Sequence, residues 1–498
     1  MPDESTSEGR AYRNMLRGAG WGALMRLSQR MIGLINIMIL ARLLTPVEIG
    51  LVALATLLIG LVDQMSNIGV SMQLIRKRDI DRNDCDSAWT MRLLIGAALA
   101  ALIAMLAQPA AAYFHEPRVE PIIYALAGAY FIKNCASIGM VLARRDLDFA
   151  TDFRFTVYVR LATFFFTVLA AFLLRNAWAI VLGTLLGNLF SVVISFRMHP
   201  YRPRFDLSRA GEYLTFGLSI LPMSFGQYLV AKVGSWIVGN AAPTEKFVAY
   251  NMGSELSHIF STQVVRTIGR GQFPNYSKIT DQRDLLSRAF SYEIGAVLTM
   301  VLPICVGLAM SAENAVPVLL GDQWAFVVVL LPWLALYQAL SAFIHLISGP
   351  ILVATGHERL SAVFVWFRLS LLVPIAYFAG QSSGVLGVAQ ALLPIGALTL
   401  PFAVAALVWS RIIALSQILA AMWRPVAAAG TMALALAFIE RGPRGTALLN
   451  LTIDVACGGA VYVGVLLMLW WIAGRPDGPE KALFKFLSGR RQIVNAGA

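Results

Sequence analysis

Seven cationic side chains fall inside long apolar stretches of the chain, where a purely structural membrane helix would avoid charge. A buried cation needs a counter-charge, and arginine matches the two oxygens of a phosphate or carboxylate with parallel hydrogen bonds. This residue type in this setting predicts a binding site for an anionic ligand. The seven residues are Arg26, Arg30, Arg92, Lys133, Arg160, Lys232 and Arg368.

Three acids in similar stretches, Asp63, Glu255 and Glu293, are candidates for pairing with these cations or for coupling transport to an ion gradient. Two of them belong to polar stripes with the i, i+4, i+7, i+11 spacing of one helix face. On otherwise apolar helices such stripes predict the sides that face a polar cavity. The stripes are Thr56, Gly60, Asp63 and Asn67, and Asn251, Glu255, His258 and Thr262.

Signatures of catalysis or metal binding are missing from the sequence. It holds no Walker loop, no HExxH and no CxxC, and its four cysteines show no paired spacing. We therefore expect no catalytic residues, no cofactor and no metal. The expected outside connections, such as residues 45–48, are short and leave no external domain to hold an acceptor, so the sequence predicts a protein that is not an enzyme.

The elements that must position these residues are membrane helices. The chain has 498 residues, of which 58% are hydrophobic and only 14% are charged, against about 25% charged in soluble domains. This excludes soluble enzymes and nucleic-acid binders, and the net charge of +12 is explained by cations in cytoplasmic loops.

Apolar stretches of span length predict an all-α polytopic membrane protein with about 14 transmembrane helices. Only five Lys and Arg lie in the expected outside loops, whereas the expected cytoplasmic segments hold more than half of the 40. Both termini are therefore expected in the cytoplasm. The expected spans are residues 21–44, 49–70, 87–107, 121–142, 155–174, 178–196, 213–239, 247–268, 289–310, 325–347, 360–380, 384–408, 425–440 and 446–473.

A weak internal repeat predicts two six-helix lobes around a central cavity, followed by two extra helices. Residues 40–48 correspond to 238–245, and residues 177–181 correspond to 384–389. Parallel repeats of this kind are common in transporters. The expected parts are a cytoplasmic segment 1–20, an N-lobe 21–196, an inter-lobe loop 197–212, a C-lobe 213–408, two helices in 425–473 and a basic cytoplasmic tail 474–498.

Four motifs resemble those of the polysaccharide-export (Wzx-like) flippases of the multidrug/oligosaccharidyl-lipid/polysaccharide exporter superfamily. Residues 39–53 read ILARLLTPVEIGLVA and resemble the family's opening signature. The stretches NIGVSMQLI at 67–75, RRDLDF at 144–149 and LGDQW at 320–324 are similar to later family motifs. The similarity covers about residues 15 to 410, in order.

This resemblance implies a flippase that moves a polyprenyl-pyrophosphate-linked oligosaccharide, such as an exopolysaccharide or O-antigen repeat unit, from the cytoplasmic to the periplasmic leaflet of a bacterial inner membrane. Implied partners are the lipid-linked saccharide, membrane lipids, a glycan polymerase and other assembly proteins, but no nucleic acid. One departure matters. Many relatives carry an acid in span seven, whereas residues 232–236 here read KVGSW, which puts a mechanism through that carboxylate in doubt.

Three alternatives stay open at this point. A peptidoglycan-precursor flippase shares the superfamily and the anionic lipid substrate, but the motif at 39–53 favours the polysaccharide branch. A cation-coupled multidrug exporter would prefer an acidic cavity. A membrane enzyme of glycan assembly would need larger external loops than this chain has.

Overall fold

The computed structural model describes residues 7–66, 74, 77, 80–146, 148–269, 282–439, 446–476 and 478–481. All regular structure within these residues is helical, which confirms the expected all-α class. The chain divides into two compact units, the first reaching Val248 and the second beginning at Ala249.

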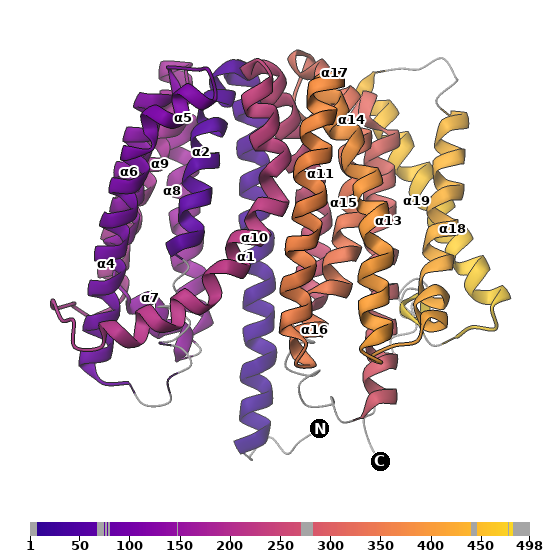
Figure 1. The fold of residues 1–498 in the computed structure, drawn as a ribbon, viewed down its shortest axis with the longest axis horizontal. Helices are drawn as coiled ribbons and strands as arrows, with labels where there is room; N and C mark the ends of the chain where they lie inside the picture. The colour runs from indigo at the N-terminus through magenta and orange to yellow at the C-terminus, as the bar shows by residue number, and fades with distance from the viewer. Residues whose placement is uncertain are drawn as a thin grey trace. The chain divides into compact units, whose positions relative to one another are not determined.

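Within the described residues, the first unit contains nine helices and the first residues of a tenth, α11, which continues into the second unit (Figure 1). Seven of the ten are at least 21 residues long, and α5 and α7 are short connecting helices. The helices are α1 (Ser7–Leu43), α2 (Pro46–Ser66), α4 (Arg82–Met105), α5 (Ala107–Tyr113), α6 (Val119–Asn134), α7 (Gly139–Arg145), α8 (Phe149–Leu174), α9 (Trp178–Met198), α10 (Ala210–Ala241) and α11 (Thr244–Gly269).

Local sequence signals set several helix starts in this unit. Pro46 begins α2, where its missing N–H removes no helical hydrogen bond, and the Thr45 hydroxyl accepts the Glu48 N–H at 3.4 Å. Asp81 caps α4 and forms a reciprocal capping box with Asp84. These signals place the breaks between helices at polar positions of the chain.

Helices α8 and α9 approach closely along a stripe of small residues. A side chain at Gly183 would meet Thr167, and one at Gly187 would meet Thr163. A Gly-xxx-Gly spacing lets two membrane helices bring their backbones together, so that van der Waals contact replaces the missing hydrophobic driving force. This contact is an interface that larger residues at 183 and 187 would break.

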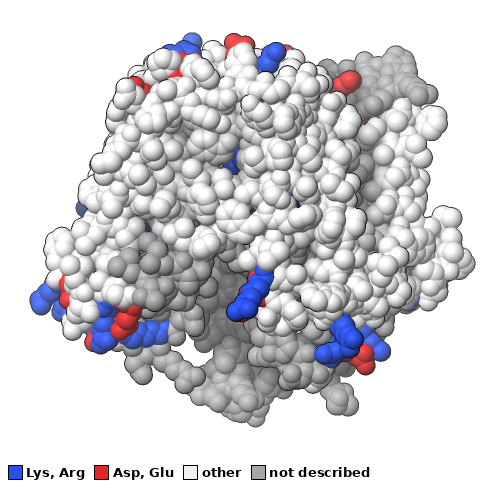
Figure 2. Space-filling view, in the orientation of Figure 1, with Lys and Arg blue, Asp and Glu red and all other residues white. Residues whose placement is uncertain are grey.

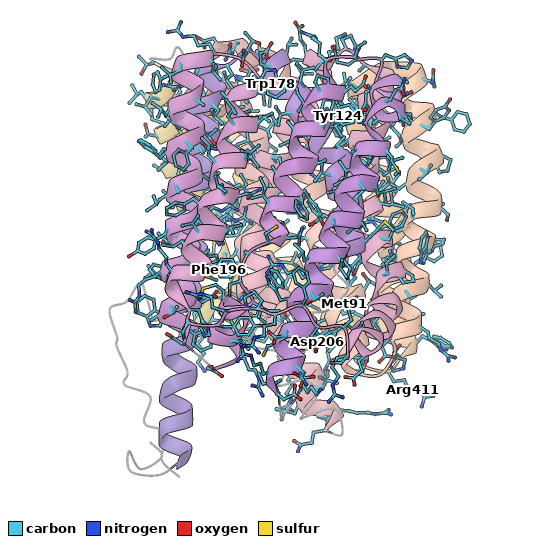
Figure 3. The ribbon with its side chains drawn as sticks, turned by 90° about the vertical axis from the view of Figure 1, so that its left-hand side faces the viewer. Met91, Tyr124, Trp178, Phe196, Asp206 and Arg411 are labelled. Carbon is cyan, nitrogen blue, oxygen red and sulfur yellow. The ribbon has the colours of Figure 1, made fainter. Side chains whose placement is uncertain are left out.

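The two ends of the first unit can be identified by labelled residues. Tyr124 and Trp178 lie near one end, and Asp206 lies near the opposite end (Figure 3). Tyr124 and Trp178 are exposed, as in the aromatic belts at membrane–water interfaces.

Within the described residues, the second unit contains five long helices, three short helical segments and the continuation of α11. Its new elements are α13 (Arg283–Met310), α14 (Ala312–Leu319), the 3₁₀ turn η1 (Asp322–Trp324), α15 (Ala325–Ser348), α16 (Pro350–Ala354), α17 (Glu358–Trp409), α18 (Leu415–Ile439) and α19 (Ala447–Ile472). Buried side chains of α13, α15 and α17 form one core, which includes Phe290, Val297, Phe343, Ile347 and Leu407.

Helix α17 covers two of the expected spans, 360–380 and 384–408. Its backbone leaves helical geometry at Ser383 and Gly384, and Gly384 has φ of +61°. This conformation suits glycine, which has no Cβ to clash. The position of this kink agrees with the sequence-based boundary between the two spans.

Nine of the described helices are long and apolar enough to cross a membrane, and the bent pair α6 and α7 would make a tenth. On the face shown in Figure 2, charged side chains gather toward the helix ends and leave a nearly uncharged band. The protein is a multi-pass membrane protein, whereas the expected number of 14 spans is not confirmed by this count.

Candidate functional site

Helix α10 carries Lys232 and is fastened at its first turns to the start of α4. The Tyr213 hydroxyl donates to the carbonyl oxygen of Asp84 at 3.1 Å. The Asp84 carboxylate in turn accepts a bond from the Lys77 ammonium at 2.6 Å. These contacts fix where α10 enters the first unit.

The segment before α10 adds a polar network on the same side of α4. The buried Asp86 carboxylate accepts from the Tyr201 hydroxyl and, at 3.1 Å, from the Arg204 backbone N–H. Ser87 donates to the Asp206 carboxylate at 2.8 Å. Burial and the bond to Asp86 raise the pKa of Tyr201, so this hydroxyl remains a donor at neutral pH. This network was not among the features expected from the sequence, although the acids at 81, 84 and 86 were its signal.

The other end of α10 is fastened to α5. The Asn240 side-chain amide donates to the carbonyl of Tyr113 at 2.6 Å, and Trp236 stacks on Phe114 with 5.4 Å between ring centroids. Helix α10 is therefore held at both ends by side chains of the first unit.

Lys232 lies on the face of α10 that these contacts define. Tyr228, Lys232 and Trp236 are one turn apart, so they share a side of the helix. Tyr228 donates to the carbonyl of Leu57 on α2 at 2.6 Å, and the Tyr113 hydroxyl bonds the Trp236 carbonyl at 3.4 Å. Lys232 is half-buried, and its helix face turns toward α2 and α5.

The remaining candidate cations of the first unit differ in their surroundings. Arg92 donates from Nη2 to the carbonyl of Lys133 at 3.0 Å, at the end of α6, where a cation also favours the helix dipole. Lys133 and Arg160 are exposed, with the Lys133 ammonium 5.8 Å from the Tyr130 ring centre. Arg30 is half-buried on α1, and the side chain of Arg26 lies outside the described part.

The candidate acids are placed by α2, α11 and α13. Asp63 and Glu255 are half-buried, and Glu293 is buried. Asn67 and the side chain of Thr262, the last members of the two polar stripes, lie outside the described residues. The two stripes are therefore only partly described by the structure.

Among the candidate cations whose side chains the structure describes, Arg368 is the most buried, at 6% exposed. Its Nη2 donates to the Tyr337 hydroxyl and to the Ser341 hydroxyl of α15, both at 2.9 Å. The guanidinium carbon lies 5.9 Å from the Tyr337 ring centre, a distance at which a ring face attracts a cation. Tyr337 and Ser341 were not among the site residues expected from the sequence, although their i, i+4 spacing places both hydroxyls on one helix face.

Two buried polar pairs of the second unit were also missed. Arg424 of α18 lies 2.9 Å from Glu480, Nη1 to Oε1. Asn314 donates to the Asp454 carboxylate at 2.8 Å, and Asp454 lines an otherwise mainly apolar cavity of about 420 Å³ between α13, α14, α18 and α19. Each pair joins residues far apart in the chain, so no local pattern indicates it.

A family of known proteins matches this chain over more than half of its length. The family model described as polysaccharide biosynthesis protein matches residues 39–329. The chain belongs to this family. The match confirms the resemblance stated from the motifs at 39–53, 67–75 and 144–149, and it includes the turn at 320–324.

Several curated proteins resemble this member of the polysaccharide biosynthesis protein family. An uncharacterized membrane protein in the cps region of Klebsiella pneumoniae is 24% identical over 379 residues, which cover 75% of this chain and 78% of the relative. The lipopolysaccharide biosynthesis protein WzxC of Escherichia coli (strain K12) is 23% identical, with 75% and 76% covered. The succinoglycan biosynthesis transport protein ExoT of Rhizobium meliloti (strain 1021) is 22% identical, with 72% of each covered.

Solved structures with the same fold include two kinds of transporter. The lipid II flippase MurJ in an inward closed conformation has a TM-score of 0.72 at 12% identity, with 91% of this chain and 99% of that chain covered. An inward-facing multidrug resistance MATE family transporter has a TM-score of 0.56 at 16% identity, with 80% and 98% covered. These similarities establish the fold but do not identify the substrate.

Proposed function

We propose that the protein is a flippase for a polyprenyl-pyrophosphate-linked oligosaccharide, which it moves from the cytoplasmic to the periplasmic leaflet of a bacterial inner membrane. The observation that carries this proposal is the family match over residues 39–329. Two similar proteins are named for lipopolysaccharide biosynthesis and for transport in succinoglycan biosynthesis, which supports transport of a glycan precursor and not an enzymatic step.

The cations held on membrane helices supply the physical reason for this substrate. A pyrophosphate loses its water shell when it enters the hydrocarbon of the membrane. This loss is too costly unless other hydrogen-bond donors replace the water. Arginine and lysine side chains can replace it. We propose that the seven cations named from the sequence bind the anionic groups of the substrate, either the pyrophosphate or an acidic sugar. The hydrogen bonds made by Tyr228 near Lys232 and by Arg368 support this role.

A peptidoglycan lipid-precursor flippase is the main alternative. Its support is the likeness to MurJ, which concerns the fold only at 12% identity. Multidrug export is less compatible, because a half-buried Lys232 and a buried Arg368 repel cationic drugs. We therefore include lipid II as a competing probe in the transport test.

Transport can be tested with the purified full chain in liposomes that contain a fluorescent polyprenyl-pyrophosphate-linked saccharide in both leaflets. A membrane-impermeant quencher reports how fast the probe moves between leaflets, and mass spectrometry reports whether it changes. We expect rapid exchange with the lipid recovered unchanged. Recovery of an elongated or cleaved glycan as the main product, or faster exchange of lipid II than of the saccharide probe, would overturn the proposal.

Variants in the same assay test the cations. Lys232→Gln should slow exchange roughly 10- to 100-fold at normal abundance, because one charge-assisted contact is worth about 1.5–3 kcal/mol. Arg154→Gln, at an exposed position near the start of α8, is the matched control and should exchange at the wild-type rate. Full exchange by Gln variants of all seven cations would show that they do not bind the substrate.

The proposal also fixes an orientation, with both termini in the cytoplasm. Single-cysteine labelling should find residues 76–86 and 269–288 accessible from the cytoplasm and residues 45–48 and 311–323 accessible from outside. Labelling of both basic segments from outside would reverse the assignment.

A further inference from the structure

The second unit contains a group of hydrogen-bond donors with too few acceptors, which we call the Arg368 cluster: Arg368, Tyr337 and Ser341. A guanidinium has five N–H donors and no acceptor. The two hydroxyls each accept one bond from Nη2 of Arg368, so each retains its own O–H proton for another partner. Nε of Arg368 is buried and has no hydrogen-bond acceptor.

The cluster also has no negative charge of its own. Among the residues that the structure describes, the ion pairs involve other side chains, and none joins Arg368 to a carboxylate. Removing a cation from water costs several kcal/mol even after the protein relaxes. Two neutral hydroxyls and one ring face compensate only part of this cost.

An anion at Nε would meet both needs at once. It would accept the N–H of Arg368 and, with small rotations, the O–H groups of Tyr337 and Ser341, and its charge would balance the guanidinium. A monovalent anion fits better than a divalent one, because the cluster contains one cation and a second negative charge would remain unbalanced in the protein interior.

We propose that the Arg368 cluster is a binding site for a monovalent anion inside the second unit. Two sources share this chemistry: a chloride ion from solution, and a carboxylate on an acidic sugar of the carried glycan. The site itself does not depend on the proposed transport function, and only the second source rests on it.

The direct test uses the unmodified protein. Crystals of the full chain grown in sodium bromide should show anomalous scattering from one bromide at about 3.3 Å from Nε of Arg368, a normal distance for a hydrogen bond to this larger ion. Absence of bromide from the cluster, with a water molecule or a protein carboxylate at Nε, would overturn the proposal.

The solution test follows the thermal unfolding midpoint of the detergent-solubilised protein. Sodium chloride replaces sodium methanesulfonate at constant ionic strength, so a specific site gives a saturable rise in the midpoint by mass action. Sodium glucuronate is the second probe. A rise with chloride alone supports an ion from solution, and a rise with glucuronate that competes with chloride supports the glycan carboxylate. A rise with neither overturns the proposal.

Variants locate the effect at the cluster. Ser341→Ala and Tyr337→Phe each remove one hydroxyl and keep the cation, and each should weaken the apparent anion affinity roughly 10-fold. Arg368→Gln should remove the response, whereas Arg359→Gln, at an exposed arginine of the same helix, should keep it. An equal response in wild type and Arg368→Gln would overturn the site. If Arg368→Gln does not fold, the hydroxyl variants and the bromide experiment test the site instead. Because no step uses the lipid substrate, failure of transport and failure of the anion site are separable.

Discussion

Two arginines of the second unit are equally buried but have different partners. Arg368 is 6% exposed and Arg424 is 7% exposed. Arg424 lies 2.9 Å from the carboxylate of Glu480, which is itself 1% exposed. Within the described part of the chain, the polar and ring contacts of Arg368 are to the hydroxyls of Tyr337 and Ser341 and to the Tyr337 ring of α15. Among the described residues, Arg424 has a carboxylate partner and Arg368 does not.

The two arginines therefore illustrate two roles of a buried charge: Arg424 stabilises the fold, whereas Arg368 is suited to binding a ligand. Glu480 follows α19, and its neighbour Pro479 would meet a side chain placed at Gly295 of α13. The Arg424–Glu480 pair therefore holds the segment after α19 against α13 and α18. Among the described residues, Arg368 forms no ion pair that holds a distant segment in place. Its charge is therefore better suited to binding a ligand than to stabilising the fold.

The largest expected effect is at the neutralised arginine. Glu480→Gln leaves Arg424 buried without its counter-charge, and breaking a buried ion pair in this way costs roughly 3–5 kcal/mol. We expect a marked fall in the thermal unfolding midpoint of the detergent-solubilised protein. Glu358→Gln, at an exposed acid in the first turn of α17, is the control and should cost at most about 1 kcal/mol.

A double variant tests the cause of that loss. Replacing the pair by Arg424→Met with Glu480→Leu removes both charges and keeps the volume apolar, so most of the stability should return. A Glu480→Gln protein as stable as the Glu358→Gln control would show that the pair does not hold the segment.

The second effect is smaller and contrasts the two arginines directly. Arg368→Met strands no acid, so it should cost only about 1–2 kcal/mol for the lost hydrogen bonds. Arg424→Met strands Glu480 and should cost about as much as Glu480→Gln. Thermal unfolding of Arg368→Met and Arg424→Met, measured side by side, shows which variant loses more stability. Equal losses of stability would contradict the view that only Arg424 depends on a carboxylate partner.

The helices could be predicted from the sequence because membrane spans are marked by length and hydropathy. The break at Thr45 and Pro46 and the kink at Gly384 were also visible, since proline and glycine have specific backbone requirements. An unusual charge in an apolar run identified Arg368 as a candidate without any structural information.

The partners of these charges could not be predicted. A helix that is apolar all round gives no periodic signal for the face that is buried, so the position of Lys232 opposite α2 and α5 required the contacts of Tyr228 and Trp236. Arg424 and Glu480 are 56 residues apart and meet only through folding. The sequence predicts a basic tail from residue 474, and the buried acid within it does not stand out.

The smallest effect concerns an exposed counterpart of the buried pair, Arg118 and Glu116 between α5 and α6. The Arg118 Nε lies 2.8 Å from Glu116, but its side chain is 58% exposed, so water and salt screen the attraction and the pair is worth at most about 1 kcal/mol. The hydrogen bond from Arg118 lowers the pKa of Glu116. A lowered carboxyl pKa contributes stability that is complete above the ordinary glutamate pKa and is lost as pH falls through the folded value.

Glu116→Gln should therefore lower stability near neutral pH by at most about 1 kcal/mol, and its difference from wild type should shrink as pH falls through the folded pKa of Glu116. Thermal unfolding of wild type and Glu116→Gln, measured from neutral pH downward at low and high salt, checks both points. High salt should shrink the difference between the two proteins, because the Arg118 side chain is exposed to solvent ions. A loss at neutral pH as large as that of Glu480→Gln would mean that exposure does not decide the strength of these pairs, and the comparison of buried with exposed charge would fail.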